Sequence, residues 1–376
     1  MSGRYEKKRE KKPLSVGKVV LTVVAVVLVL VAALGVAGAI YYNRMLGKLN
    51  QVEVGKINYT QPTTQAVEET REEPEDVKET EATTEEATEP PHVASSADYL
   101  NILLVGQASR DGEAERFADT MILCTINTYE KTLTMTSLLR DTLVKMPDYK
   151  KHYGGKIKLT TIYHLGSVYG DGVAGSMELM NQTLYDNFGI EVDYNVEIDF
   201  EAFIRVIDRL DGVKVELTQA EADYLTHKAK GYVYREMHEG PETLWGAEAL
   251  AYARMRKAEG DGESDIKRTV RQRALMNSIV DSLRKKDLGS IQSIINEVLP
   301  MVTVSMNNSE ITQLLTQLLP MLPDLQIVDG GTCPANYSGD MVDIYKDGMM
   351  HSILRFDVEE TKKTMREITL GEIPTP

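Results

Sequence analysis

Five arginines lie within twenty residues of this chain, namely Arg254, Arg256, Arg268, Arg271 and Arg273. A guanidinium group keeps its proton in proteins, and its planar fork donates paired hydrogen bonds to phosphate oxygens. Arg254 and Arg256 point to the same side if residues 252–256 are extended. Several such groups aimed at one point indicate a fixed polyanion such as a diphosphate. Spacing alone favours a solvated helix face with Arg–Glu pairs, because the 376-residue chain carries a net charge of −15.

A helix over 266–285 would bring part of this cluster onto one stripe. Residues three and four positions apart are neighbours on a helix surface, so Asp265, Arg268 and Gln272 would share a face. Arg271 lies three positions after Arg268 and would flank that stripe. Such a helix would therefore place the basic side chain of Arg268 and the amide side chain of Gln272 side by side, where both could bind one ligand.

A second group of polar residues borders two candidate strands. Arg116 and Asp119 come just before the candidate strand 121–126, and Arg140 lies at the end of the candidate strand 133–139. Ligand crevices in open α/β sheets form at strand ends. Polar residues that directly adjoin such apolar strands are either sheet caps or site residues, and this second group favours a phosphate site over a solvated helix face.

The composition and the absence of several motifs disfavour other classes of protein. The acidic balance argues against a nucleic-acid binder, which needs excess Lys and Arg to neutralise phosphates. The six histidines form no H-x-x-x-H pair, and the chain has no G-x-S-x-G elbow and no P-loop. Two cysteines exclude a disulfide framework and a four-thiolate metal site. Whether Cys124 and Cys333 pair stays open.

Strand-like and helix-like patterns alternate from residue 99 onward. The predicted strands are 101–105, 121–126, 133–139, 192–200 and 213–217. The predicted helices are 176–188, 203–210, 246–253, 266–285, 289–299, 308–318 and 357–367. This alternation predicts an α/β fold in which helices cover a mixed sheet. Because no second linker follows, we expect one domain over residues 98–373.

The first 97 residues divide by charge into three segments. Residues 1–18 form a basic tail, and the uncharged run 19–41 would span roughly 34 Å as a helix, enough to cross a membrane. The basic tail predicts a cytoplasmic N-terminus and an extracytoplasmic remainder. A cleaved signal peptide is the alternative, although the run is longer than usual for one. Residues 42–97 are acidic and poor in apolar residues, which predicts a disordered extracellular linker.

In this layout and in its motifs, the chain resembles the LytR–CpsA–Psr family of bacterial envelope proteins. The motifs are Asn101-Ile-Leu-Leu-Val-Gly106, Arg116-Phe-Ala-Asp-Thr120-Met-Ile-Leu, Leu139-Arg-Asp-Thr142, Val196-Glu-Ile-Asp-Phe-Glu-Ala-Phe203, Asp211-Gly-Val213, Ala249-Leu-Ala-Tyr-Ala-Arg-Met-Arg256 and Asp265-Ile-Lys-Arg-Thr-Val-Arg-Gln272. They run in the family's order across residues 100–285. The resemblance rests on the whole set, because no single motif is specific.

The resemblance implies an extracytoplasmic, Mg²⁺-dependent phosphotransferase. Such enzymes move a glycopolymer from a polyprenyl-pyrophosphate carrier to peptidoglycan, and the family fold is an α/β/α sandwich with an apolar pocket for the polyprenyl chain. By motif, Asp119 would hold the metal, and Asp119, Arg140 and Arg254 would serve catalysis. The residues implied to bind the diphosphate are Arg110, Arg116, Arg140, Arg254, Arg256, Arg268, Arg271 and Gln272. No nucleic acid is expected as a partner.

The chain departs from the family pattern after its first motif. The family often has an acidic residue two positions after the glycine, whereas Gly106 is followed here by Gln107 and Ala108, and Asp111 is a candidate substitute. This departure motivates one alternative to the transferase, a non-catalytic envelope protein that binds polyprenyl phosphates and has a regulatory role. A lipid pyrophosphatase, which hydrolyses the same donor, is a further alternative.

Overall fold

The structure is a computed structural model of the whole chain. It describes residues 47, 50–55, 57, 59, 96–107, 116–256, 265–345 and 348–371. The predicted basic tail and membrane anchor, most of the predicted linker, and Arg110, Ala108 and Asp111 lie outside this range. Within it, no helix combines the length and the apolar composition that crossing a bilayer requires. Residues 50–376 make up one compact unit, which is described below.

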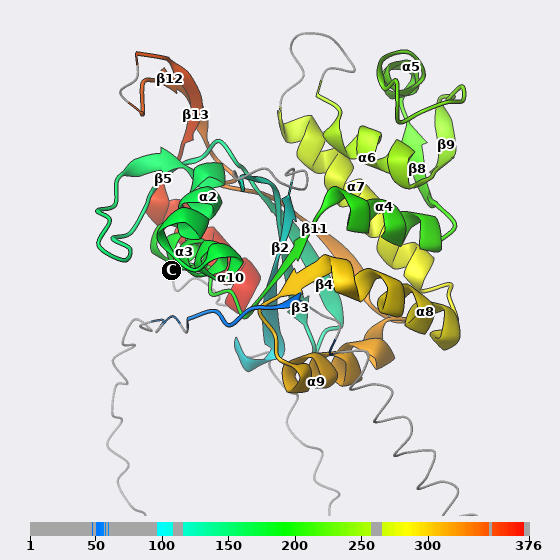
Figure 1. Ribbon diagram of the computed structural model, residues 1–376, viewed down its shortest axis with the longest axis horizontal. Helices are drawn as coiled ribbons and strands as arrows, with labels where there is room; N and C mark the ends of the chain where they lie inside the picture. Colours follow the sequence, from blue (N-terminus) through cyan, green and yellow to red (C-terminus); the bar gives the residue numbers. More distant parts are fainter. Residues whose placement is uncertain are drawn as a thin grey trace, which may run out of the picture. The chain divides into compact units, whose positions relative to one another are not determined.

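A mixed sheet of seven strands, in the order β1-β10-β7-β2-β3-β4-β11, forms the centre of this unit (Figure 1). The strands are β1 (Asn50–Gln51), β10 (Val302–Val304), β7 (Tyr194–Ile198), β2 (Tyr99–Gln107), β3 (Ala118–Asn127), β4 (Thr132–Leu138) and β11 (Gln326–Cys333). The three central strands β2, β3 and β4 are antiparallel neighbours, whereas β7 runs parallel to β2 and β11 runs parallel to β4. The predicted mixed sheet is confirmed.

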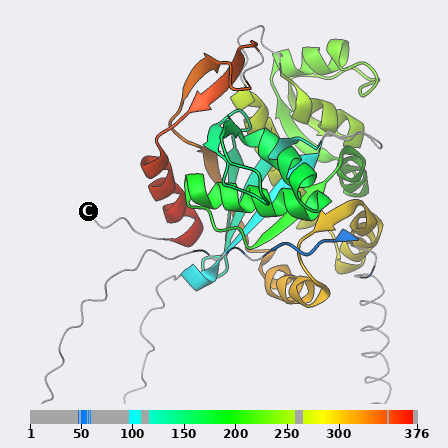
Figure 2. The same cartoon turned by 60° about the vertical axis from the view of Figure 1, so that its left-hand side comes forward.

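Three two-stranded ribbons lie outside the central sheet. They are β5 (Leu143–Lys145) with β6 (Lys156–Lys158), β8 (Val213–Leu217) with β9 (Gly240–Leu244), and β12 (Ser338–Val342) with β13 (His351–Arg355). The β12–β13 hairpin follows the last strand of the sheet and projects away from it, in orange in Figures 1 and 2.

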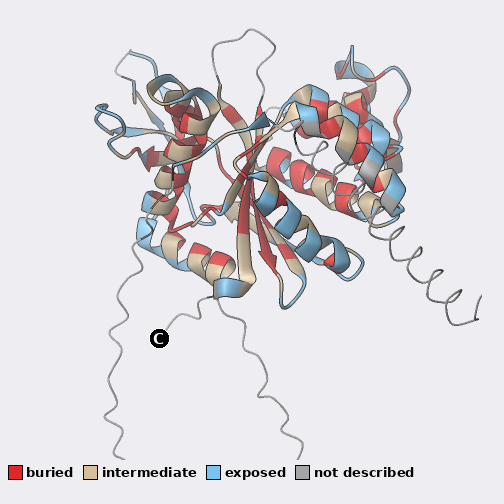
Figure 3. Cartoon of the chain, turned by 60° about the horizontal axis from the view of Figure 1, so that its bottom comes forward, coloured by how far each residue is buried: buried red, intermediate tan, exposed pale blue. Residues whose placement is uncertain are grey.

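Helices cover both faces of the sheet. On one face lie α2 (Leu159–Tyr169), α3 (Gly172–Phe188) and α10 (Val358–Leu370). The other side of the sheet carries α4 (Phe200–Arg209), α5 (Gln219–Lys228), α6 (Gly246–Arg254), α7 (Asp265–Leu283), α8 (Leu288–Val298) and α9 (Asn308–Leu318). Single 3-10 turns lie at Ser96–Asp98, Leu299–Met301 and Leu319–Met321. The helices turn their buried sides toward the sheet and their exposed sides outward (Figure 3).

The alternation of side chains along β2 explains the two layers. Leu103 and Val105 pack with α2 and α3, whereas Ile102 and Leu104 face the opposite layer. A strand that is apolar at successive positions is expected where both faces of a sheet are covered. The short apolar run in the sequence therefore reflects burial on both sides.

The predicted linker overlaps the folded unit, which corrects its boundary. Asn50 and Gln51 form β1 at the edge of the sheet, and Val52 and Val54 pack against the core. Farther on, the Tyr59 hydroxyl donates to the backbone carbonyl of Val192 and accepts from its backbone N–H, each over 3.2 Å. Val192 lies in the loop before β7. The sequence shows only two valines at alternating positions here, which is too short a pattern to predict a strand. The strand β1 forms because it pairs with β10 at the edge of the sheet.

Candidate functional site

A polar cavity of about 320 Å³ opens where β3 starts and β4 ends. It is lined by Asp119, Thr120, Met121, Leu138, Leu139, Arg140, Asp141, Ile266, Arg268, Thr269, Gln272, Tyr337, Ser352 and Leu354. Four of the predicted site residues meet here, from β3, from the turn after β4 and from α7: Asp119, Arg140, Arg268 and Gln272. Two residues of the predicted stripe on α7 and two of the predicted strand-end residues thus face one space.

Charges of opposite sign alternate along the wall of this polar cavity. The Arg140 Nη1 atom lies 2.8 Å from the Asp119 Oδ1 atom, and the Arg140 Nε atom lies 3.5 Å from Asp141 Oδ2. Lys158, at the end of β6, donates to Asp141 over 2.8 Å. These residues therefore hold one another in place before any ligand arrives. Lys158 was not predicted as part of the site, because its role depends on a short ribbon that the sequence does not signal.

An apolar cavity of about 110 Å³ adjoins the polar one. Its lining consists of Leu104, Gly106, Thr120, Ile122, Ile198, Asp199, Phe200, Phe203, Leu250, Ala253, Arg254, Gln272, Leu275 and Met276. Thr120 and Gln272 belong to both linings, and the Gln272 Nε2 atom donates to Thr120 Oγ1 over 2.9 Å. The apolar cavity forms a slot between the sheet and helices α4, α6 and α7. This slot meets the polar cavity at the hydrogen bond between Thr120 and Gln272.

Arg254 stands at the rim of the apolar cavity, on the last residue of α6. Its guanidinium carbon lies 4.7 Å from the centre of the Phe200 ring, and its Nη1 atom donates to the Tyr232 hydroxyl over 3.1 Å. The helix continues to Arg254, so the condition that residues 252–256 are extended is not met over the whole segment. Arg254 and Arg256 are nevertheless both exposed, with Met255 buried between them.

Arg271 lines neither cavity, which separates it from the predicted diphosphate cluster. Its Nη1 atom lies 3.3 Å from Glu221 Oε1, its Nη2 atom donates to the Met255 carbonyl over 2.6 Å, and the residue is 4% exposed. Successive helical residues differ by about 100° in direction, so the neighbour of Gln272 points elsewhere. Arg273 likewise pairs with Asp329 and the Ser137 hydroxyl.

Arg116 also belongs to a separate cluster. Its Nη1 atom lies 2.8 Å from Glu197 Oε1 on β7, and the other oxygen of Glu197 accepts from the Tyr163 hydroxyl over 2.8 Å. Burial, with Glu197 beside it, raises the pKa of Tyr163 well above its usual value, so this hydroxyl remains a donor. These contacts join β7 and α2 to the start of β3, and Arg116 lines neither cavity.

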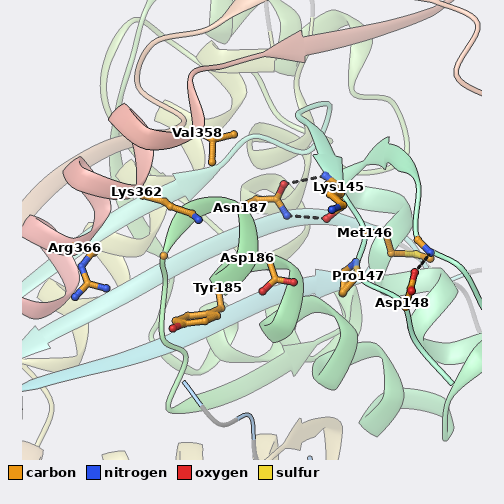
Figure 4. Close-up of a pocket in the computed structure, with 12 residues that line it drawn as sticks. Lys145, Met146, Pro147, Asp148, Tyr185, Asp186, Asn187, Val358, Lys362 and Arg366 are labelled. Carbon is orange, nitrogen blue, oxygen red and sulfur yellow. Dashed lines mark hydrogen bonds between the residues drawn. The ribbon is translucent and has the colours of Figure 1, made fainter. Parts of the chain in front are cut away.

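A wider cavity of about 610 Å³ lies between α3, α10 and β5 (Figure 4). Lys145, Lys362 and Arg366 line it together with Asp148 and Asp186. None of the predicted site residues that the structure describes lines it, and its charges are mixed. It therefore offers no counterpart to the two joined cavities.

The polar cavity suits a divalent cation that shares its coordination with a substrate. No group of three or more His, Cys, Asp or Glu side chains is placed to hold a metal within the described ranges. Mg²⁺, however, is commonly held by one or two carboxylates plus substrate phosphates. Asp119 keeps a partly exposed carboxylate in the cavity wall while only one of its oxygens engages Arg140 in the ion pair. Asp119 therefore fits a metal ligand of this kind.

The chain matches the LytR_cpsA_psr family over residues 57–363, which is well over half of its length. It belongs to the LytR_cpsA_psr family. Six of the seven motifs named from the sequence converge on the site: the segments 101–106, 116–123, 139–142, 196–203, 249–256 and 265–272 each contribute to one of the two cavity linings, whereas 211–213 contributes to neither.

Curated members of the LytR_cpsA_psr family are similar to about half of the chain. The polyisoprenyl-teichoic acid–peptidoglycan teichoic acid transferase TagT of Bacillus subtilis (strain 168) is 34% identical over 199 residues, which are 52% of this chain and 55% of TagT. A TagU transferase of Oceanobacillus iheyensis is 35% identical over 184 residues, covering 49% of this chain and 51% of TagU. The chain therefore spans about half the length of the curated relatives it matches.

Solved structures of LytR_cpsA_psr relatives share the fold. A structure of TagT bound to LIIa-WTA has a TM-score of 0.54 and 26% identity, covering 74% of this chain and 92% of that chain. A YwtF (TagT) structure with bound octaprenyl pyrophosphate lipid has a TM-score of 0.51 and 24% identity, covering 74% of this chain and 92% of that chain. The predicted combination of a mixed sheet with flanking helices is thus confirmed by comparison as well as by the strand order.

Proposed function

We propose that this chain is an extracytoplasmic phosphotransferase that moves a glycopolymer from a polyprenyl-pyrophosphate carrier to peptidoglycan. The names of TagT and TagU support this assignment, as does the octaprenyl pyrophosphate in a structure of the same fold. The predicted anchor at residues 19–41 would place the folded unit outside the cell, beside both substrates.

The joined cavities are the observation that carries this proposal. A polyprenyl pyrophosphate is apolar along its chain and doubly charged at its head, and the site has the same division. The chain would occupy the slot lined by Phe200 and Phe203, and the pyrophosphate would lie beyond the Thr120–Gln272 pair. Apolar contacts and charge-assisted hydrogen bonds would then hold the two ends of one ligand.

The reaction exchanges one phosphorus–oxygen bond for another. A peptidoglycan hydroxyl attacks the phosphorus that carries the glycopolymer, the bond from that phosphorus to the bridging oxygen breaks, and polyprenyl phosphate leaves. The hydroxyl proton passes to the departing phosphate or to solvent. Arg268 and Gln272 face the head group and would align its non-bridging oxygens, which is the main requirement of phosphoryl transfer.

Arg140 and Arg254 approach the head group from the other sides. Arg140 would neutralise charge that builds up on the phosphates, and Arg254 would cover the junction with the lipid chain. Mg²⁺, held by Asp119 and by the substrate phosphates, would add positive charge at the same place. Arg140 also positions Asp119, because the two side chains form an ion pair.

A reconstitution with the full-length protein tests the assignment. The protein, Mg²⁺, a lipid-linked glycopolymer and peptidoglycan should yield polymer joined to peptidoglycan by a phosphodiester, together with free polyprenyl phosphate. Asp119→Asn and Arg254→Ala should each lower the rate by roughly 10²–10³-fold, because each removes charge stabilisation of the transition state. Arg205→Ala is the matched control, since Arg205 on α4 forms surface ion pairs with Glu201 and with Glu297 of α8, outside both cavities.

The products separate the three functions. Release of polyprenyl phosphate without attachment to peptidoglycan would identify a pyrophosphatase. Lipid that binds tightly but is never turned over would identify a non-catalytic binding protein. A protein that neither binds nor converts the donor would contradict the proposed site altogether.

A further inference from the structure

Exposed apolar side chains gather on the hairpin beside the polar cavity. Fourteen large apolar side chains are exposed in the part of the chain that the structure describes, and five of them lie between residues 337 and 350. Met341, Tyr345, Met349 and Met350 are 52, 41, 59 and 57% exposed on or next to the loop between β12 and β13. Surface apolar residues are normal when scattered, whereas a cluster indicates a contact surface.

This hairpin is continuous with the proposed substrate site. Tyr337 and Leu354, near the base of the hairpin, and Ser352, near its loop, line the polar cavity. The backbone N–H of Leu354 donates to the Asp141 carbonyl over 2.9 Å, and the Tyr345 hydroxyl lies 3.1 Å from Thr161 Oγ1 on α2. The hairpin is therefore held beside the cavity, and Figure 1 shows that it projects from the sheet.

The chain also enters the sheet at its cavity end. Asn50 of β1 pairs with Thr303, which pairs with Glu197, and Glu197 pairs with Val105. The next residue along β2 is Gly106, which pairs with Thr120 between the two cavities. The hairpin leaves the sheet at this same end, because β11 stops at Cys333, opposite the last residue of β4.

The length of the preceding segment limits how far this end can lie from a membrane. Eight residues, 42–49, separate the predicted anchor from Asn50. Fully extended, they span at most about 30 Å. The acidic run of residues 60–95 cannot lengthen this tether, because Asn50, Gln51 and Tyr59 already contact the domain before it and the chain is part of the domain again at Ser96.

We propose that the tip of the β12–β13 hairpin contacts the lipid bilayer and sets the cavity mouth against the membrane surface. This proposal rests on the proposed function, in which a membrane lipid is the donor. Methionine is unbranched and adapts to disordered acyl chains, and tyrosine suits the boundary between apolar and polar layers. The tether joins the sheet at its β1 edge and the hairpin leaves it at the opposite, β11 edge, both toward the cavity end of the strands, so one surface that faces this end can meet both.

Quenching of a single tryptophan tests this contact without any need for turnover. The full-length chain, with its one native tryptophan replaced in a Trp245→Phe background, receives Met350→Trp or Tyr129→Trp. Tyr129 is a matched control, because it is 51% exposed in the turn at the opposite end of β3 and β4. The proteins are reconstituted in vesicles of phosphatidylglycerol and phosphatidylethanolamine with or without brominated acyl chains.

The brominated chains should quench Met350→Trp at least about twofold more than Tyr129→Trp, with a blue-shifted emission, because an interfacial ring lies near the acyl region. Met341→Trp should behave like Met350→Trp. Equal quenching at the two ends of the sheet would overturn the proposal. Emission that responds to soluble glycan fragments and not to lipid would also overturn it and would make the hairpin an acceptor contact.

A kinetic experiment addresses the same surface through the proposed reaction. Changing both Met349 and Met350 to serine should raise KM for a vesicle-embedded donor several-fold and leave kcat unchanged, because contact with the membrane brings the mouth to the donor. The rate with a short-chain, water-soluble donor should not change. An inactive wild-type protein would contradict the transferase assignment, while the quenching result would still decide whether the tip meets the bilayer.

Discussion

The two faces of the central sheet are built from the same strands and yet differ in how completely they are filled. On one face Phe188, Tyr163 and Leu179 are fully buried against Leu103 and its neighbours. On the other face, the side chains of alternate residues of the same strands border an open apolar slot. Since the strands alternate sides at every residue, one apolar sequence supplies both a solid core and the wall of a ligand cavity.

The helices that cover each face account for this difference. On the filled face, Gly166 and Gly175 let α2 and α3 come so close that a methyl group at Gly166 would lie 2.4 Å from the Gly175 carbonyl oxygen. On the open face, α7 is fixed by long side chains: Arg273 reaches Ser137 on β4, and Arg271 reaches Glu221. A helix attached through extended arginines can stand away from a sheet without losing its position.

The largest effect should come from the filled face. Phe188→Ala should lower the free energy of unfolding by about 3–5 kcal/mol, because a rigid core leaves the removed ring as a cavity. Urea unfolding of the full-length protein measures this change. The rate of transfer per folded molecule should stay the same, and a loss of catalysis without loss of stability would show that the filled face serves the reaction directly.

Close helix packing gives the second prediction. Gly166→Ala should destabilise the fold by about 1–3 kcal/mol, because the added methyl group meets the backbone of α3 and the helices must separate. Gly155→Ala is the control, since its added methyl group has no neighbour within 4 Å. Thermal unfolding compares the two variants, and equal Tm values would refute the packing argument.

Much of the fold follows from local patterns in the sequence. The alternation in residues 192–200 and the helical spacing in 176–188 predict β7 and α3, and both were found close to those bounds. The short strands β1 and β10 carry too few residues for a pattern. Their conformation depends on pairing, of β10 with β7 and of β1 with β10. Helix α2 was also missed, since its many small and aromatic residues are buried by tertiary contacts rather than by a clear helical stripe.

The site shows the same limit at the level of single side chains. Spacing on a helix correctly groups Arg268 with Gln272, because both depend only on helical geometry. Spacing cannot show that Arg271 forms an ion pair with Glu221, which lies fifty residues away in the sequence. A buried acid on a different helix leaves no local signal, so a binding arginine and a structural arginine look alike in the sequence.

A third, smaller effect should arise on the open face. Phe203→Ala should weaken binding of polyprenyl phosphate by about tenfold, because it removes part of the apolar wall that the chain would cover. The loss of stability should be smaller than for Phe188→Ala, since Phe203 is only partly buried. Val270→Ala, at an exposed site on α7 outside both linings, should leave lipid binding as it is. Unchanged lipid binding by Phe203→Ala would show that the lipid chain does not occupy this slot.

The two cysteines are buried on opposite faces of the sheet, and both thiols are free. Cys124 follows Thr120 and Ile122 along the open face, whereas Cys333 belongs to the filled core. Burial raises the pKa of Cys124 to about 12, and burial also raises the pKa of Cys333. Since only the thiolate reacts, the Cys124 thiol should react with a disulfide reagent at pH 8 roughly 10³-fold more slowly than a free thiol.

Comparing the two thiols under native conditions locates the inner end of the slot. If the slot ends at Ile122, Cys124 and Cys333 should be equally inert, and both should react at once in denaturant because they form no disulfide. A Cys124 that reacts much faster than Cys333 would mean that the open face admits reagent beyond Ile122. The slot would then accommodate a longer stretch of lipid than its resting volume of about 110 Å³ allows.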